Sequence, residues 1–452
     1  MSEETYWAER ASEVEATLVA RVPENKIRPR LEPTRRLVEL LGDPQKIYRI
    51  IHVTGTNGKT STTRFIERLL REHGLRTGRF TSPHLVKLNE RLSIDGEPVS
   101  DEALVAAWED IAPIVEIVDA ELAAAGEGAL TFFEVLAVLG FAVFADAPVD
   151  VLVLEVGMGG EWDSTNVADG DVAVFAPISL DHMERLGNTI EEIAKTKSGI
   201  IKSGAFVVAS AQPAEALAVL KDKAASTADA FKSYGTDFEV LESTPDILGQ
   251  KVSIRTLAGE YSDLNLPVHG YYQAENAALA VAAVEAFLGN GERRILDDIV
   301  RVSFADIASP GRLQVVSREP LTIVDGAHNP HGVTSLAKAL KQSFNSPRAV
   351  GVVGILNGKN VDEMLETLAG SFEHVIITAS KSDRSVEIEE LASMAAKFWS
   401  EDAISVSSSV AKAIQDAREL VAETELDAIV VTGSLSVVGE ALTMVQEENN
   451  ED

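Results

Sequence analysis

Short apolar runs alternate with helical segments along most of this sequence, and this alternation restricts the chain to a small set of folds. The apolar run 47–53 precedes an amphipathic segment, 62–74, whose spacing predicts a helix. The runs 149–157 and 171–178 are almost continuously apolar, which is typical of strands covered on both faces. The repetition predicts an α/β fold with a mainly parallel sheet wrapped by helices.

The chain of 452 residues is longer than one hydrophobic core usually supports, so two domains are expected. The segment 236–268 alternates more and carries turn residues, which predicts a small β-rich insertion. Pro310 and Gly311 lie together where the strand–helix alternation stops and then restarts, which indicates a linker. The predicted parts are an N-terminal domain over 1–305, a linker over 306–311 and a Rossmann-like C-terminal α/β domain over 312–452.

Charge and composition exclude several classes of protein. The chain has 40 Lys and Arg against 71 Asp and Glu, a net charge of −31, so neither a nucleic-acid partner nor an anionic membrane is expected. A small acidic substrate remains possible, because a local basic pocket is enough to bind it. The sequence contains no cysteine, which excludes disulfides, thiolate metal sites and cysteine nucleophiles.

Nothing in the sequence predicts export or membrane insertion. The N-terminal segment 1–10 is acidic and lacks the basic-then-apolar pattern of a signal peptide. The apolar run 135–145 is too short to cross a bilayer and is interpreted as a buried core helix. We therefore expect a cytoplasmic protein, and we expect it to be a monomer.

A glycine-rich loop, "TGTNGKTS", joins the first predicted strand to its helix and indicates a phosphate-binding site. Glycines allow backbone N–H groups to turn inward, and the positive end of the helix faces the same space. Lys59 would neutralise the β- and γ-phosphates, and Thr60 would offer its hydroxyl to Mg²⁺. The general pattern has glycine where this chain has Val53. The alternative is an ordinary strand–helix turn with a surface lysine. The predicted nucleotide-binding residues here are Gly55, Thr56, Asn57, Gly58, Lys59, Thr60 and Ser61.

Further polar residues follow other predicted strands. Glu155 ends the strand 149–157, and the carboxyl ends of parallel strands face the ligand crevice of such a sheet. Thr60, Ser82 and Glu155 supply the hard oxygen atoms that Mg²⁺ prefers, and His182 could complete a second metal site. Each also has a structural alternative, because a strand-end glutamate often accepts hydrogen bonds from a cap and a loop histidine is often solvated.

Seven segments together carry a resemblance to a known family. They are "HVTGTNGKTS", "TSPHL", "LEVGMGGEWDSTN", "SLDHMERLG", "IAKTKSGIIK", "SPGRLQ" and "VDGAHNP", in this order. The set closely resembles the folylpolyglutamate synthetase and dihydrofolate synthetase branch of the Mur ligase superfamily, from about residue 30 to residue 440. One departure is "LNGKN", where relatives often have Asp-Lys-Asp and this chain flanks Lys359 with Gly358 and Asn360. That departure puts a glutamate-binding role for this loop in doubt.

The resemblance implies an ATP-dependent amide ligase. Mg-ATP would phosphorylate a substrate carboxylate to an acyl phosphate, and the amine of L-glutamate would then displace phosphate. Phosphorylation removes the repelling charge of the carboxylate and creates a leaving group, so catalysis is mostly positioning and charge stabilisation. The acceptor would be dihydropteroate, the γ-carboxyl group of a reduced folate, or both. The sequence leaves a bifunctional enzyme and one that only elongates folates as alternatives.

The resemblance also assigns roles in the metal site and around the nucleotide. Ser82, Glu155 and His182 would bind Mg²⁺, with two sites expected. Lys197 resembles the lysine that family members carry as a carbamate, which requires a lowered pKa because the amine must first lose its proton. The alternative is an ordinary exposed lysine near a helix end. The predicted catalytic residues are Lys59, His182, Lys197 and Arg312.

In the C-terminal domain, which would close over the nucleotide, Asp325 would accept the ribose hydroxyls beside His328. Arg312 would reach the γ-phosphate, and Asn276 resembles the adenine-contacting asparagine. Asp325 and His328 could instead stabilise a strand-end turn. Ser434 could contact the substrate or could only cap a helix.

The segment 81–97 resembles the family's folate-binding loop, and "TFFE" its neighbour. Aromatic rings there would stack on a flat pterin, and a carboxylate would bind its amino-pyrimidine edge; the alternative places the phenylalanines in the core. The predicted folate contacts are Ser82, Pro83, His84, Phe132, Phe133 and Glu134.

Two rival functions remain. A cell-wall peptide ligase of the same superfamily shares the loop and metal residues but usually needs an N-terminal UDP-binding domain, for which residues 1–53 are too few. A nucleotide switch or regulatory ATPase would need neither "SPHL" nor the Lys197 region, and it would turn over ATP without glutamate.

Overall fold

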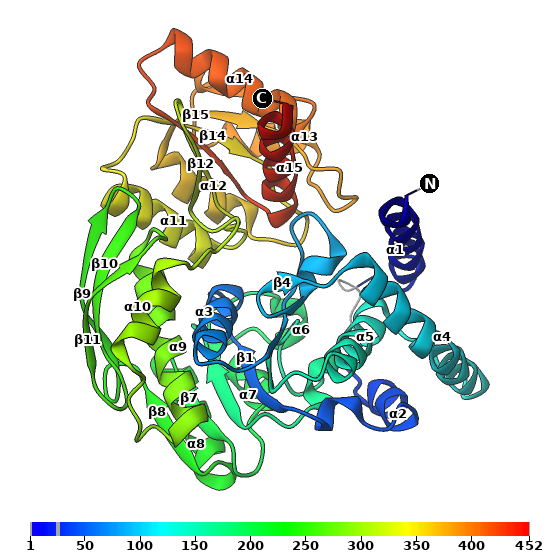
Figure 1. The fold of residues 1–452 in the computed structure, drawn as a ribbon. Coiled ribbons are helices and arrows are strands. Elements are labelled where there is room, and N and C mark those ends of the chain that lie inside the picture. Colours follow the sequence, from blue (N-terminus) through cyan, green and yellow to red (C-terminus); the bar gives the residue numbers. More distant parts are fainter. Residues whose placement is uncertain (1, 24–27, 452) are drawn as a thin grey trace. The chain divides into compact units, whose positions relative to one another are not determined.

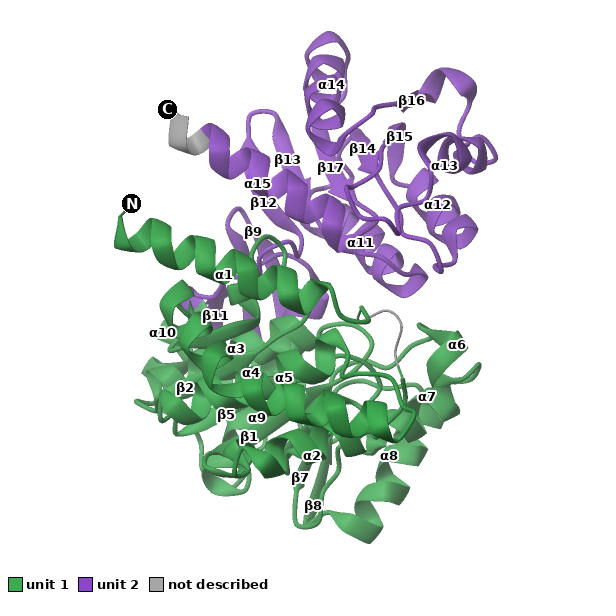
Figure 2. Ribbon diagram, turned by 90° about the vertical axis from the view of Figure 1, so that its right-hand side faces the viewer, with its two compact units in different colours: residues 1–241, 254–262, 275–304 green, residues 242–253, 263–274, 305–452 purple. Residues whose placement is uncertain are grey.

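The computed structural model describes residues 2–23 and 28–451, which form two compact units. Unit 1 contains residues 1–241, 254–262 and 275–304, and unit 2 contains residues 242–253, 263–274 and 305–452 (Figure 2). Each unit is built around its own sheet, as predicted for an α/β chain of this length (Figure 1).

Unit 1 holds an eight-stranded sheet in the order β4-β3-β2-β5-β1-β6-β7-β8. The strands from β2 to β8 in this order run parallel, and β3 and β4 add an antiparallel edge. The bounds are β1 Arg49–Thr54, β2 Thr77–Phe80, β3 Leu92–Ile94, β4 Glu97–Pro98, β5 Val151–Glu155, β6 Val172–Phe175, β7 Phe206–Ala209 and β8 Ala230–Ser233.

Helices cover both faces of this sheet. One face packs Leu152 and Leu154 against α4 and α5, and α7 and α8 continue this layer over β6 and β7. Helix α3 packs on the other face, against β1, β2 and β5. The bounds are α1 Glu3–Val19, α2 Glu32–Leu40, α3 Lys59–Glu72, α4 Asp101–Ala124, α5 Phe132–Asp146, α6 Met183–Leu186, α7 Ile190–Ser198 and α8 Ala214–Thr227, with 3-10 turns at Pro44–Lys46, Leu88–Arg91 and Ser164–Val167.

Local sequence signals explain where these helices begin and end. The predicted capping box of α7 is present, because Thr189 Oγ1 accepts the Glu192 N–H and the Glu192 carboxylate accepts the Thr189 N–H. Helix α3 begins at Lys59, three residues before the predicted helix, and Gly74 follows its end with a φ of 87°. The apolar run 135–145 is a buried part of α5, which confirms the predicted core helix.

The apolar face of α3 is fully buried, as its spacing predicts. Each such side chain contributes roughly 1.5–3 kcal/mol relative to an exposed one, so this face holds α3 firmly on the sheet. The residues are Phe65, Ile66, Leu69 and Leu70.

The predicted β-rich insertion forms a three-stranded sheet in the order β11-β10-β9, whose residues are divided between the two units. Its strands are β9 Glu239–Asp246, β10 Gly249–Arg255 and β11 Glu260–Leu266, and the helices α9 Tyr271–Gly289 and α10 Asp297–Ala305 follow.

Unit 2 holds a six-stranded sheet in the order β12-β13-β17-β14-β15-β16. Only the pair β12–β13 is antiparallel among its described pairs. Helices α11, α12 and α13 share one buried core with the sheet, and α14 and α15 contact it as well. The bounds are β12 Gln314–Arg318, β13 Leu321–Val324, β14 Ala349–Val353, β15 Phe372–Ile377, β16 Ile404–Val406, β17 Ala428–Thr432, α11 Pro330–Ser343, α12 Val361–Ala369, α13 Ile388–Ala395, α14 Val410–Glu423 and α15 Leu435–Glu451, with a 3-10 turn at Glu401–Ala403.

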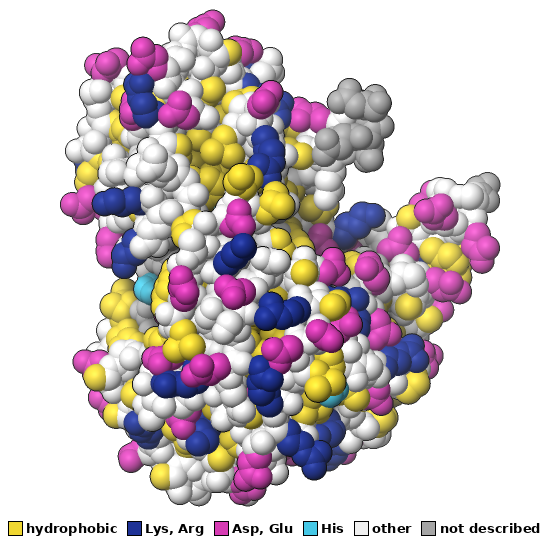
Figure 3. All heavy atoms as spheres, turned by 60° about the vertical axis from the view of Figure 1, so that its left-hand side comes forward, with side chains coloured by type: hydrophobic (Ala, Val, Ile, Leu, Met, Phe, Trp, Pro, Cys, Tyr) yellow, Lys and Arg dark blue, Asp and Glu magenta, His cyan; other side chains and the backbone are white. Residues whose placement is uncertain are grey.

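The face of the molecule in Figure 3 shows acidic and basic side chains interspersed. Within the described ranges, no helix combines the length and the apolar character that crossing a bilayer requires.

Candidate active site

The glycine-rich loop lies between β1 and α3 in unit 1 and is anchored to the segment after β6. The Thr56 N–H donates to the Pro177 carbonyl at 2.8 Å, and Thr56 Oγ1 donates to the Ser179 carbonyl at 3.0 Å. Gly55 has a φ of 152°, and a Cβ at this position would lie 2.7 Å from the Cβ of Ala176. Glycine is therefore required at 55 both by backbone conformation and by this close approach.

Two lysines converge on this loop. Lys59 Nζ donates to the Gly55 carbonyl at 3.2 Å and to the Thr56 carbonyl at 3.3 Å. Lys197 Nζ donates to the same Gly55 carbonyl at 2.8 Å, from the last turn of α7. The Lys59 ammonium gives the loop a positive charge that suits an oligophosphate, and the Lys197 amine lies beside it on the same carbonyl oxygen.

Lys197 is 3% exposed, so the alternative of an exposed lysine is wrong. Burial, helped by the nearby charge of Lys59, lowers the pKa of Lys197 to about 7, against the opposing effect of Asp181 and Asp163. The lowered pKa supplies the neutral amine that a carbamate needs at neutral pH. The carbamate itself stays a prediction.

Three predicted magnesium ligands meet at the end of β5. The Glu155 carboxylate is 1% exposed, accepts the Thr60 hydroxyl at 3.0 Å and lies 3.4 Å from the Ser82 backbone nitrogen, which donates to it. No group of three or more His, Asp and Glu side chains suited to a metal ion occurs among the residues that the structure describes. One carboxylate with two hydroxyl-bearing residues nevertheless fits Mg²⁺, which usually keeps water and substrate phosphates as its other ligands.

His182 lies on the segment after β6 that also anchors the loop. Its backbone adopts a φ of 50°, and its N–H donates to the Asp181 carboxylate at 2.8 Å. Its ring nitrogen Nε2 lies 3.8 Å from the same carboxylate, and its side chain is 37% exposed. The metal-binding role of His182 stays a prediction.

Asn276, the predicted adenine contact, lies on α9 and is buried. Its Oδ1 lies 2.7 Å from the position that a Cβ would take at Gly58, which itself has a φ of 84°. Asn276 thus packs directly against the phosphate-binding loop of its own unit. Any larger residue at 58 would displace it.

In unit 2, Asp325 lies in the turn after β13 and is buried. Its carboxylate accepts the Leu313 N–H at 2.8 Å and the Ala327 N–H at 2.9 Å. Burial raises the pKa of Asp325, and the charge of Arg312 opposes that rise. His328 Nδ1 lies 2.8 Å from the Gly326 carbonyl. These bonds show the turn-stabilising role that the sequence left open, and ribose contact stays a prediction.

Ser434 has a clear structural role. Its hydroxyl accepts the Val437 N–H at 3.2 Å and lies 3.2 Å from Ser436 Oγ, directly before α15. The alternative of a helix N-cap is therefore confirmed, and contact with substrate stays a prediction.

Part of the predicted folate region is held together by Arg91, a residue that the sequence did not single out. Arg91 Nε donates to His84 Nδ1 at 2.9 Å, and its guanidinium carbon lies 5.2 Å from the ring centre of Phe132. Ser82 and Pro83, in the same loop, are joined by a cis peptide bond. Arg91 thus links the "SPHL" loop to the first residue of α5.

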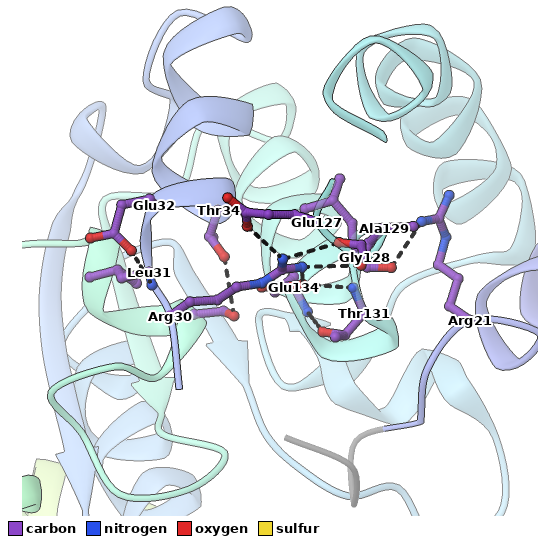
Figure 4. A network of polar contacts seen from close by, with 12 residues as sticks. Arg21, Arg30, Leu31, Glu32, Thr34, Glu127, Gly128, Ala129, Thr131 and Glu134 are labelled. Atoms are coloured by element: carbon purple, nitrogen blue, oxygen red, sulfur yellow. Dashed lines mark hydrogen bonds and ion pairs between the residues drawn. The ribbon is translucent and has the colours of Figure 1, made fainter. Parts of the chain in front are cut away.

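Three neighbouring residues of this region serve the fold. Phe132 is 6% exposed and belongs to the buried core, which confirms the core alternative for that ring, whereas Phe133 is partly buried and packs edge-to-face on Phe80 with ring centres 6.1 Å apart. Glu134 accepts the Thr131 N–H at 2.6 Å in a capping box, and Arg30 donates to its two carboxylate oxygens at 2.9 and 3.0 Å (Figure 4). The expectation that Glu134 binds a pterin edge is not supported by this geometry, because both of its oxygens are already used.

Comparison with known sequences identifies the family. Residues 102–284 match the Mur ligase middle domain, and residues 311–435 match the Mur ligase glutamate ligase domain. A dihydrofolate synthase/folylpolyglutamate synthase of Mycobacterium tuberculosis is 41% identical over 96% of this chain and 93% of the relative. This chain belongs to the folylpolyglutamate and dihydrofolate synthase branch of the Mur ligase superfamily.

Other members of this branch support the assignment. A protein of the same name from Bacillus subtilis is 36% identical over 83% of this chain and 87% of the relative. The solved structure of Mycobacterium tuberculosis folylpolyglutamate synthase complexed with ADP has a TM-score of 0.92 and 39% identity, and the match covers 97% of this chain and 99% of that one. The α/β architecture predicted from the sequence is therefore confirmed.

The loop 356–360, in which this chain departs from the pattern of the folate-ligase branch, lies directly before α12. Asn360 Nδ2 donates to the Glu363 carboxylate at 2.6 Å, so the residue that replaces an acid contributes to the start of the helix. Sequence reasoning also missed Tyr272, a partly buried tyrosine of unit 2 that packs against its core and whose pKa is raised by burial and by the nearby Asp325. Its position next to "QAEN" was the only available signal.

Proposed function

We propose that this chain is an ATP-dependent ligase that joins L-glutamate to dihydropteroate, to the γ-carboxyl group of a reduced folate, or to both. The observation that carries the proposal is the convergence of Lys59 and Lys197 on the Gly55 carbonyl. The Lys59 ammonium suits a triphosphate whose terminal group is transferred, and Lys197 lies beside it on the same loop carbonyl. Membership of the folate branch supplies the class of acceptor.

The chain's own residues account for the first step, in which the substrate carboxylate attacks the terminal phosphorus and ADP leaves. The loop amides and Lys59 hold and neutralise the phosphates. Mg²⁺, when bound through Thr60, Ser82 and Glu155, supplies further charge neutralisation on the phosphate oxygens. Holding the acceptor carboxylate in line with the terminal phosphate lowers the entropic part of the barrier.

In the second step, the amine of glutamate attacks the acyl carbon and inorganic phosphate leaves. We propose that Lys197 acts as a carbamate and His182 as a ligand in a second metal site. Burial and the lowered pKa of Lys197 support the carbamate. In the C-terminal part, we propose that Asp325 and His328 bind the ribose, that Arg312 stabilises the γ-phosphate, and that Ser434 contacts glutamate.

The domain boundaries, 1–305 and 312–452 with a linker between them, are part of the proposal. A monomer acting in the cytoplasm is also proposed, and the absence of cysteine is compatible with a reducing compartment.

The bifunctional enzyme is preferred to one that only elongates folates, because the Mycobacterium and Bacillus relatives are both named for two activities.

The test is an assay of ADP release together with mass spectrometry of the products. Purified protein receives ATP, Mg²⁺, glutamate and either dihydropteroate or tetrahydrofolate. ADP release that needs both glutamate and the acceptor, with a product heavier by one glutamyl residue, supports the ligase. ADP release that is independent of both would contradict the ligase. Product from both acceptors would support the bifunctional enzyme, and product from tetrahydrofolate alone would support an enzyme that only elongates folates.

A further inference from the structure

Helix α3 and strand β2 carry more positive charge than their carboxylates can pair. Four arginines lie on these two elements, whereas the same elements contain only two glutamates. The arginines are Arg64, Arg68, Arg71 and Arg79, and the glutamates are Glu67 and Glu72.

Three of these arginines use both carboxylates. Arg68 Nη1 donates to Glu72 at 2.7 Å, and Arg71 Nε donates to Glu67 at 3.1 Å. Arg79, which is buried beneath α3, donates to Glu67 at 3.4 Å. Nε of Arg79 is buried with no partner among the described residues. Glu67 is therefore shared by two guanidinium groups and the Thr77 hydroxyl.

Arg64 is the arginine that remains. Its side chain is partly buried, and it forms no hydrogen bond or ion pair with any residue in the described ranges. Its other carboxylate neighbours are Glu155 and Glu90. Glu155 already accepts hydrogen bonds from Thr60 and Ser82.

Glu90 is also occupied. Its carboxylate accepts the backbone N–H groups of Leu85, Val86 and Lys87 at 2.8–2.9 Å. This arrangement holds the "SPHL" loop, so both of these acidic neighbours of Arg64 already accept other hydrogen bonds. A partly desolvated cation without a bonded anion is costly, and a carboxylate ligand would offset that cost.

The position of Arg64 relates it to the reacting groups. Arg64 follows Thr60 by one helical turn, and residues four apart on a helix share a face with side chains that lean toward the N-terminus. Arg64 therefore lies on the side of α3 that faces Glu155 at the end of β5. The predicted folate loop flanks it through Glu90.

We propose that the guanidinium of Arg64 binds the reacting carboxylate of the folate-type acceptor and orients it toward the terminal phosphate. This inference rests on the proposed function, in which the acceptor acid lies beside both the phosphate loop and Glu155. A guanidinium fits a carboxylate with two parallel hydrogen bonds, which fixes the direction of attack as well as the position.

The decisive experiment is to measure binding of two ligands that differ only in charge. The first is dihydropteroate, or tetrahydrofolate if the wild-type enzyme uses only that acceptor. The second is the same molecule with its reacting carboxylate converted to a carboxamide. Dissociation constants are measured by calorimetry with Mg²⁺ and the non-hydrolysable analogue AMPPCP present, so that no turnover occurs.

Arg64→Gln is expected to weaken binding of the carboxylate ligand by about 10- to 100-fold and to leave binding of the carboxamide within about twofold of the wild type. Arg64→Lys should recover part of the loss, because it restores the charge but not the paired geometry. Arg71→Gln is the matched control: it removes one positive charge from the same helix, from a residue whose partner is Glu67, and should change neither constant.

Several outcomes would overturn the inference. An equal loss for both ligands would mean that Arg64 only maintains the site, and unchanged binding of both would mean that it does not meet the carboxylate. If Arg64→Gln only raises the KM for glutamate in the turnover assay, Arg64 would be assigned to glutamate and not to the acceptor. If wild-type protein neither binds these acceptors nor ligates glutamate to them, the proposed function fails instead, which is a distinguishable result.

Discussion

The carboxyl ends of the two sheets differ in how their polar groups are satisfied. In unit 1, Lys59 and Lys197 share one carbonyl oxygen and Arg64 has no bonded carboxylate. In unit 2, the Asp325 carboxylate accepts two backbone N–H groups and Ser434 caps α15, whereas the buried hydroxyls of Thr378 and Thr432 have no partner among the described residues. The first edge brings basic side chains together around the phosphate loop, whereas the second uses its carboxylate and its serine to hold a turn and a helix end. Charge that the protein does not neutralise is available to bind an anionic substrate.

The strongest test of the charged edge is Lys59→Ala. We expect ligation to fall by about 10³-fold or more, because the phosphates lose a counter-ion in a water-poor site. Initial rates of ADP release measure this loss, and the circular-dichroism melting curve should be unchanged. Retention of wild-type turnover would mean that the charged edge of unit 1 is not the phosphate site.

Glu155→Ala should have the next largest effect on activity. Turnover is expected to fall by about 10²-fold, with a higher Mg²⁺ concentration needed for half-maximal rate, because a carboxylate is removed from the proposed metal ligands Thr60, Ser82 and Glu155. Titration of the rate with MgCl₂ measures both changes. An unchanged Mg²⁺ requirement would separate Glu155 from the metal and leave it as the acceptor for Thr60 alone.

Asp325→Ala tests the carboxyl end of the unit 2 sheet. We expect a loss of about 2 kcal/mol in the free energy of unfolding of unit 2, because two N–H groups lose their acceptor in a buried turn. Urea denaturation measures this loss, and the KM for ATP reports the proposed ribose contact separately. Unchanged stability together with a large loss of activity would erase the contrast between the two edges.

The lowered pKa of Lys197 predicts a specific pH dependence. Because burial lowers its folded pKa to about 7, the unfolded chain binds more protons than the folded one between about pH 7 and pH 10. The contribution of Lys197 to stability should therefore increase over this range as pH rises. Comparison of urea denaturation for wild type and Lys197→Met should show this slope only in the wild type, and parallel curves would contradict the lowered pKa.

Ser434→Ala should give the smallest effect, a loss of about 1 kcal/mol from removal of a helix N-cap. Urea denaturation again measures the change, and Ser434→Thr, which keeps the hydroxyl, is the control. Loss of activity without loss of stability would support the proposed contact with glutamate. It would also show that the edge of unit 2 is not wholly structural.

Much of the fold follows from local signals in the sequence. The capping box of α7 and the buried helix α5 were predicted because each depends on residues close together in the chain. The pairing of Arg30 with Glu134 was not predicted, since 104 positions separate them and only the packed fold brings them together. The sequence therefore predicted a pterin contact for Glu134, which stays a prediction, and did not reveal its pairing with Arg30.

The sequence by itself determined the glycine-lysine loop, the parallel α/β plan and the polar residues at the strand ends, because these depend on backbone conformation and on the period of apolar side chains. Only the tertiary structure decided which charges remain unbalanced. Whether Arg64 finds a carboxylate, or whether Lys197 is desolvated, depends on distances between segments remote in sequence. Electrostatic energy at low dielectric is set by those distances.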